Sequence, residues 1–200
     1  MAAAIIGIDL GTTFSAVANL DEVGRPKIVH NEEGQNITPS CIAVDDDGRL
    51  DVGTETARRQ LALAPETGAV FFKRDMGTKA TFAFGGREYT PTDLSAEVLK
   101  KIVKDVTGSV GQIGGAVVTI PANFAHEARN ATLQAARHAG LDVKNIINEP
   151  TAAALYYAHD QGQNLSGLYA VYDLGGGPFD ISILRVEGHD VAVGTSNGVS

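Results

Sequence analysis

The feature that most constrains the fold is a pattern that occurs twice, once near each end of the chain. In residues 5–20 and again in residues 170–184, an apolar run leads into Asp-Leu-Gly, small residues follow, and a second apolar run begins. Glycine permits the backbone angles of a tight turn, so each copy predicts a strand, a turn and a second strand. Glycine also leaves backbone N–H groups open to a ligand, and an Asp at the strand end suits a cation beside a phosphate chain. We therefore expect the two hairpins to close on one polyphosphate.

The duplication matters because one such hairpin is weak support for a ligand site. Hairpin turns use glycine whether or not they bind anything. Two copies with matched apolar flanks favour a shared function. The sequence has neither the G-x-x-x-x-G-K-[ST] phosphate loop nor a G-x-G-x-x-G dinucleotide fingerprint after a strand, so those two classes of nucleotide site are excluded.

Composition narrows the class of protein further. With 200 residues and 44% apolar residues, the chain can bury a substantial core. The net charge of −8 argues against a nucleic-acid partner, which would need clustered Lys and Arg. We expect no membrane span, no secretory leader and, with Cys41 as the single cysteine, no internal disulfide. The expected location is the cytoplasm.

The middle of the chain alternates between strand and helix patterns. The sequence predicts strands or hairpins at 4–20, 27–30, 41–44, 82–89, 116–120 and 143–147, and helices at 55–63, from 91, at 124–138 and from 149. Thr90, Pro91 and Asp93 form a helix-start pattern, and Leu94, Val98, Ile102 and Val106 then mark one buried stripe. This alternation predicts an α/β fold with a layered sheet.

Acidic residues stand at the ends of several predicted strands. Asp9 and Asp173 close equivalent strands, and Glu149 lies between a strand and a helix that starts with Pro150. Three carboxylates meeting in one crevice would suit a hydrated magnesium ion. Glu149 alone could equally be an acid favoured by a helix N-terminus. Lys73 could neutralise phosphate, but its own residue context favours a solvated surface lysine.

Taken in order, these motifs resemble the N-terminal ATPase region of the 70-kDa heat-shock chaperones, the DnaK type, within the actin/hexokinase/heat-shock superfamily. The similarity runs along almost the whole chain, and the most specific stretch is Asn-Glu-Pro-Thr-Ala-Ala-Ala at 148–154. The matching segments are 7–13, 36–40, 58–60, 65–67, 72–74, 118–124 with Arg129, 147–154, and 173–177 with 179–180.

The resemblance implies a fold and a division of the chain. The expected fold is a ribonuclease-H-like lobe that carries a smaller inserted α+β subdomain. Residues 1–35 and 109–170 would form the first ribonuclease-H-like subdomain, residues 36–108 the insert, and residues 171–200 the phosphate hairpin that starts a second lobe, whose remainder is absent.

The resemblance also implies roles for individual residues, with ATP or ADP, Mg²⁺ and K⁺ as cofactors. Nucleotide binding would fall to Gly11, Thr12, Thr13, Phe14, Gly175, Gly176, Gly177 and Pro178. Asp9, Glu149 and Asp173 would order magnesium through water, and Lys73, Glu149, Asp173 and Asp180 would serve hydrolysis, with Asp180 joining a monovalent-cation site. Pro121 and Arg129 would couple nucleotide state to a client domain. Partners of the full-length protein would be unfolded peptides, a J-domain co-chaperone and a nucleotide exchange factor.

Two departures from the family pattern affect these expectations. Pro178 stands where the family usually has Thr, which removes a backbone donor and a hydroxyl, so we expect slower hydrolysis. From the resemblance we expect the second lobe and its adenosine pocket to be missing from these 200 residues, and therefore expect weak nucleotide binding and poor turnover. The alternatives are an actin-like filament protein, a sugar or acetate kinase of the superfamily, and a non-catalytic nucleotide-sensing relative.

Overall fold

A computed structural model describes residues 3–161, 166–176, 179–187 and 190–199, and its architecture is mixed α/β, as the sequence predicts. The largest sheet has the strand order β11-β10-β1-β2-β3, and β4 pairs with β2 off this path. Strand β1 runs parallel to β10, which runs parallel to β11, whereas β1 and β2 form the expected antiparallel hairpin. The bounds are β1 Ala4–Asp9, β2 Phe14–Leu20, β3 Pro26–Ile28, β4 Thr38–Pro39, β10 Ile113–Ile120 and β11 Val143–Asn148.

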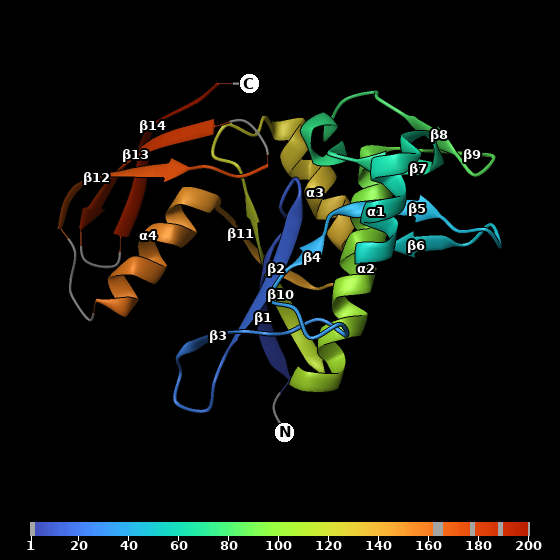
Figure 1. The fold of residues 1–200 in the computed structure, drawn as a ribbon. Helices are drawn as coiled ribbons and strands as arrows, with labels where there is room; N and C mark the ends of the chain where they lie inside the picture. The colour runs from blue at the N-terminus through green and yellow to red at the C-terminus, as the bar shows by residue number, and fades with distance from the viewer. Residues whose placement is uncertain (1–2, 162–165, 177–178, 188–189, 200) are drawn as a thin grey trace.

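Two helices, α2 (Pro91–Val110) and α3 (His126–His138), cover one face of this sheet (Figure 1). Strand β1 alternates, so that Ile6 and Ile8 are buried against the helices while Asp9 at its end is exposed. This alternation is what a half-covered sheet requires. It places the end of β1, with its turn, at the edge of the core and open to a ligand.

Helix α2 supplies the stripe of the core that its sequence predicts. Thr90 caps it by accepting from the Asp93 N–H, and the Asp93 carboxylate accepts from the Thr90 N–H, so the predicted capping box is present. Its four stripe residues, Leu94, Val98, Ile102 and Val106, are each at most 2% exposed. The residues that recur every four positions therefore form the side of α2 that packs on the sheet.

A second group of elements lies beyond α2. A three-stranded sheet, β6-β5-β7, packs against α1, and β8 pairs with β9 in the predicted hairpin. A short 3-10 turn, η2, carries Lys73 and Arg74. The bounds are β5 Cys41–Val44, β6 Leu50–Val52, α1 Glu55–Leu63, η1 Pro65–Thr67, β7 Gly68–Val70, η2 Phe72–Asp75, β8 Phe82–Phe84 and β9 Arg87–Tyr89.

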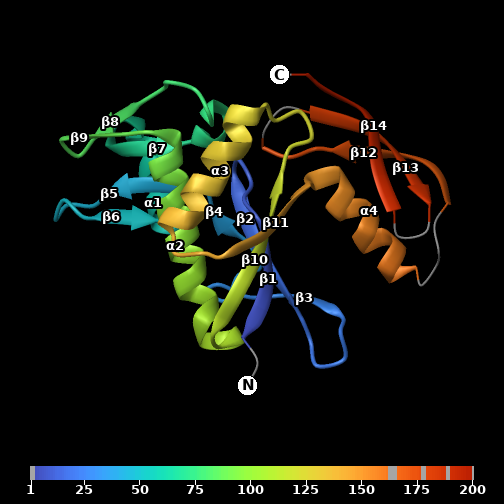
Figure 2. The same cartoon turned by 180° about the vertical axis from the view of Figure 1, so that it is seen from behind.

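The second hairpin belongs to a separate three-stranded sheet, β12-β13-β14, on the other side of the main sheet from α2 and α3 (Figures 1 and 2). Helix α4 (Glu149–Asp160) covers one face of it through Ala154, which packs with Leu184 and Val186. The strands are β12 Ser166–Asp173, β13 Phe179–Glu187 and β14 Asp190–Val199. The repeated sequence pattern therefore builds one hairpin in each of two sheets.

Some element boundaries differ from the sequence expectation. Strand β3 is Pro26–Ile28 rather than 27–30, although the Val29 N–H still donates to the Val17 carbonyl. Helix α3 begins at His126 rather than Phe124, because the backbone of Ala125 is extended (φ −65°, ψ 167°) and makes that residue the N-cap. Strand β10 begins three residues before the expected start at 116.

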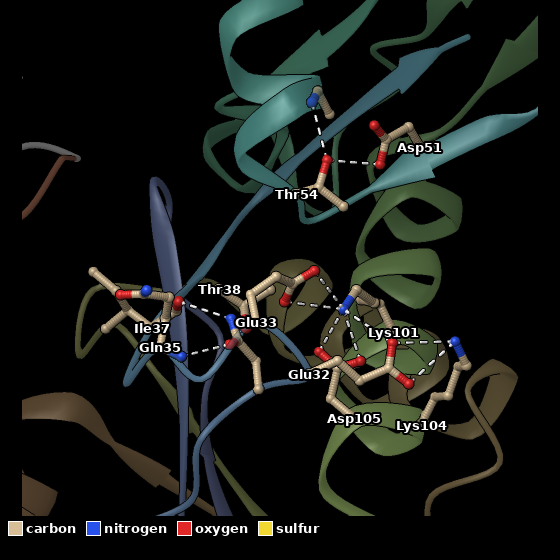
Figure 3. A network of polar contacts seen from close by, with 12 residues as sticks. Glu32, Glu33, Gln35, Ile37, Thr38, Asp51, Thr54, Lys101, Lys104 and Asp105 are labelled. Atoms are coloured by element: carbon tan, nitrogen blue, oxygen red, sulfur yellow. Dashed lines mark hydrogen bonds and ion pairs between the residues drawn. The ribbon is translucent and has the colours of Figure 1, made fainter.

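A network of charged side chains fixes α2 to the loop after β3 (Figure 3). The Lys101 Nζ donates to the Asp105 carboxylate at 2.7 Å and to Glu33 at 3.3 Å, and Lys104 pairs with Glu32 at 3.3 Å. The Asp105 side chain is only 1% exposed. This loop leads directly into β4, so the network helps to hold the surroundings of the first hairpin.

In the part of the chain that the structure describes, no helix combines the length and the apolar character needed to cross a membrane.

Candidate functional site

The turn of the first hairpin is built around Gly11. A side chain there would overlap the Phe14 carbonyl oxygen, so the turn requires glycine. Two buried hydroxyls hold it: the Gly11 N–H donates to Ser15 Oγ at 3.2 Å, and Ser40 Oγ donates to the Gly11 carbonyl at 2.8 Å. Ser15 and Ser40 also bond to each other at 3.0 Å. These bonds fix the conformation of the turn before any ligand binds.

The turn of the second hairpin meets the first. A Cβ on Gly176 would overlap the Thr13 side chain, so the two turns touch at this point. The Thr13 Oγ1 is buried and has no hydrogen-bond partner among the described residues. A buried hydroxyl usually has a partner, so the hydrogen-bonding capacity of Thr13 Oγ1 is unused among the described residues. Gly177 and Pro178 lie outside the described residues.

Both turns open onto one cavity of about 680 Å³. This volume lies in the range of small-molecule sites. The cavity brings together residues that are far apart in the sequence. Its lining includes the polar residues Asp9, Thr12, Thr13, Lys73, Thr119, Glu149, Asp173 and Asp180, together with Gly11, Phe14, Pro121, Gly175 and Gly176.

Lys73 and Glu149 form a buried ion pair in this cavity. Lys73 Nζ lies 2.7 Å from Glu149 Oε1, and the two side chains are 7% and 18% exposed. The Lys73 ammonium also lies 5.8 Å from the centre of the Phe124 ring. The expectation of a solvated surface lysine, drawn from its own residue context, is therefore wrong, because η2 turns Lys73 inward to a partner 76 positions away.

The electrostatics of the cavity centre on Glu149. Burial raises the pKa of its carboxyl, Lys73 opposes that rise, and the carboxylates of Asp9 and Asp173 add to it. The pKa of Asp180 is also raised, first by burial and then by Asp173. The negative charges of Asp9 and Asp173 thus oppose ionisation of Glu149, and a bound cation would offset that repulsion.

Side chains at the end of β10 and in the turn that follows it hold two of these acids. Thr119 Oγ1 donates to Asp9 at 2.9 Å, and Asn123 Nδ2 donates to Asp180 at 3.4 Å. Neither Thr119 nor Asn123 was singled out from the sequence. Their place at the carboxyl end of a buried strand is the signal that could have found them.

The other sequence-predicted residues are placed less decisively. Pro121 lines the cavity at the end of β10, whereas Arg129 lies half-buried on α3. Among the described residues, no group of three His, Cys, Asp or Glu side chains is close enough to bind a metal directly. The acids Asp9, Glu149 and Asp173 thus share the cavity without forming a direct ligand cluster.

The family model described as Hsp70 protein matches residues 5–83 and 78–199. The chain belongs to the Hsp70 family. Among curated Hsp70 relatives, the chaperone protein DnaK of Thermotoga neapolitana is 46% identical over 183 residues, which is 91% of this chain and 30% of DnaK. The chain therefore spans about a third of the length of this relative. The residues that the family model matches include both turns, Lys73 and Glu149.

Proposed function

We propose that this chain forms the phosphate-binding part of the nucleotide site in an Hsp70 N-terminal ATPase region. The observation that carries the proposal is the cavity where two glycine turns, a buried lysine and four carboxylates meet. The Hsp70 match supports it and argues against the actin-like alternative.

The site fits the phosphate chain of ATP or ADP. Thr13 Oγ1 is a buried hydroxyl that lacks a partner among the described residues, and Gly11 and Gly176 stand where a side chain would fill the turn. Backbone amides of Thr12, Thr13 and the second turn would bind phosphate oxygens, as glycine-rich turns can. In this way residues 11–14 and 175–178 would bind the nucleotide, as the resemblance implies.

We assign the charged residues as follows. Asp9, Glu149 and Asp173 would hold magnesium through its water shell, which suits an ion that keeps its water. Magnesium supplies charge neutralisation at the phosphates when bound. Lys73 would stabilise charge on the terminal phosphate and orient water, a contribution of the kind that phosphoryl transfer requires. Asp180 would help to bind a monovalent cation.

The domain division and the wider cycle are part of the same proposal. Residues 1–35 and 109–170 would be the ribonuclease-H-like subdomain, 36–108 its insert, and 171–200 the start of a second lobe. Pro121 and Arg129 would couple the nucleotide to a client domain. Peptide clients, a J-domain co-chaperone and an exchange factor would be partners of the full-length protein.

The test is a calorimetric titration of the chain with Mg-ATP, using K73Q and the control K79Q. Gln at position 73 keeps a donor near Glu149 but removes the charge, whereas Lys79 is exposed outside the cavity. We expect K73Q to weaken binding about tenfold or more, which is about 1.4 kcal/mol, and K79Q to leave it unchanged. No binding by the unsubstituted chain, or equal affinity of the two variants, would refute the proposal.

A further inference from the structure

The segment from Phe71 to Gly77 carries two adjacent cations that have different partners. Lys73 is buried and pairs with Glu149, as described above. Arg74, the next residue, is exposed and its Nη2 donates to the Gly176 carbonyl at 2.8 Å. One short turn of η2 thus contacts both the start of α4 and the turn of the second hairpin.

The backbone at Phe71 is arranged to present Arg74. Phe71 has φ 58° and ψ 12°, and among the described residues it is the one non-glycine residue with positive φ. That conformation is unfavourable for a bulky residue and is retained only where the surroundings enforce it. The Arg74 guanidinium lies 4.9 Å from the centre of the Phe71 ring, so the ring supports the cation from one side.

The base of this segment is fixed to α3. Met76 is buried in a cluster with Ala128 and Ala131. A Cβ on Gly77 would lie 2.5 Å from the Ala128 nitrogen, so the two backbones are in close contact. Arg74 therefore reaches the second hairpin from a firmly packed support.

From these contacts we propose that Arg74 is a positioning residue for the phosphate site. By holding the Gly176 carbonyl, it keeps the Gly175–Gly176 turn against Thr13, so that both turns are set before a ligand binds. The inference rests on the proposed function, because its consequence is tighter binding of a polyphosphate. Pre-organisation of this kind improves affinity by removing the cost of ordering a loop.

Arginine has properties here that lysine lacks. Its planar guanidinium can stack on Phe71 and direct one N–H at a carbonyl in the same geometry. A lysine would keep the charge but offer a flexible point donor. R74K should therefore weaken Mg-ATP binding less than R74A does, without keeping the full affinity of the unsubstituted chain.

The test combines two measurements on R74A, R74K and the control R87A, which removes an exposed arginine from β9. The first is the ¹³C chemical shift of the Gly176 carbonyl in the ligand-free chain, which reports its hydrogen bond directly. The second is the affinity for Mg-ATP by calorimetry, with melting temperatures to show that every variant is folded.

We expect R74A to move the Gly176 carbonyl resonance upfield and to weaken Mg-ATP binding about tenfold, with R74K intermediate and R87A unchanged. If the unsubstituted chain binds and R74A binds equally well, the positioning role is refuted while the proposed function stands. An unmoved Gly176 resonance in R74A would also refute it. If the unsubstituted chain does not bind Mg-ATP, the proposed function fails and the positioning role fails with it.

Discussion

The two hairpins share a sequence pattern but differ in how the rest of the molecule supports them. The β1–β2 hairpin lies inside the main sheet, flanked by β10 and β3, with α2 and α3 over one face. The β12–β13 hairpin belongs to a three-stranded sheet that α4 covers on one face, and Leu168, Tyr172 and Leu174 on and beside β12 are 66–81% exposed. The first hairpin is therefore part of the core, and the second lies at its margin.

This difference shows that the local pattern determines the turn, whereas the surroundings determine how firmly the turn is held. Gly11 is held by two buried serines, Ser15 and Ser40. Gly176 is held by an exposed side chain, Arg74, and by contact with Thr13. We infer that the first turn is the rigid part of the site and the second is the adjustable part.

G11A should have the largest effect and tests whether the first turn is the rigid one. The added methyl would overlap the Phe14 carbonyl, a backbone atom inside the main sheet that cannot easily move. We expect a loss of about 2–3 kcal/mol in the free energy of unfolding, as for other overpacked sites, measured by urea titration. G7A is the control, because a Cβ at Gly7 meets nothing closer than 3.8 Å. Equal stability of the two variants would show that the first turn is not rigid.

A matched pair of serines gives the next largest effect. Ser15 and Ser182 are both buried, but Ser15 serves the Gly11 N–H as well as Ser40, whereas Ser182 bonds to Ser196. S15A leaves a backbone donor without its partner and should cost about 1–3 kcal/mol. S182A should cost about 0.5–1 kcal/mol, because it removes one hydroxyl bond. If thermal unfolding showed a larger loss of stability in S182A than in S15A, the first turn would not be the more firmly held of the two.

The smallest effect concerns the charged network beside the first hairpin. Burial raises the pKa of Asp105, against the opposing effect of Lys101, with Glu32 and Glu33 adding to the rise. A carboxyl with a raised pKa binds its proton more readily in the folded state, so its contribution to stability is full below its usual pKa and is lost as pH rises through the raised value. Each pKa unit of rise corresponds to about 1.4 kcal/mol.

D105N removes this pH dependence. Its unfolding free energy should therefore improve relative to the unsubstituted chain as pH increases from about 4 to 7, in urea titrations at each pH. Mg-ATP affinity should stay the same, since Asp105 lies outside the cavity. A stability difference that does not vary with pH would contradict the raised pKa.

The sequence predicts the parts of this structure that depend on neighbouring residues. The first hairpin, the capping box of α2 and the buried stripe of α2 are such features, and the structure contains them. The sequence also predicts the α/β class, because alternation of strand and helix patterns is read along the chain.

Features that depend on distant residues could not be predicted in this way. The burial of Lys73 results from Glu149, 76 positions away, and Arg74 meets a carbonyl 102 positions away. Thr119 and Asn123 acquire their role because the sheet places the end of β10 beside both hairpins. Local sequence patterns do not predict contacts between residues so far apart in the chain. The family resemblance implies the role proposed for Lys73, which its own sequence neighbours do not indicate.

A calorimetric comparison of three chains tests most directly whether both turns bind the same phosphate chain. Mg-ATP is titrated calorimetrically into the unsubstituted chain, G176A and G7A. The methyl of G176A would displace the second turn from the Thr13 side chain, while G7A adds the same group to β1 where there is room. We predict that the unsubstituted chain and G7A bind Mg-ATP with the same affinity, and that G176A binds it at least about tenfold more weakly. Equal affinity of all three would contradict a shared site.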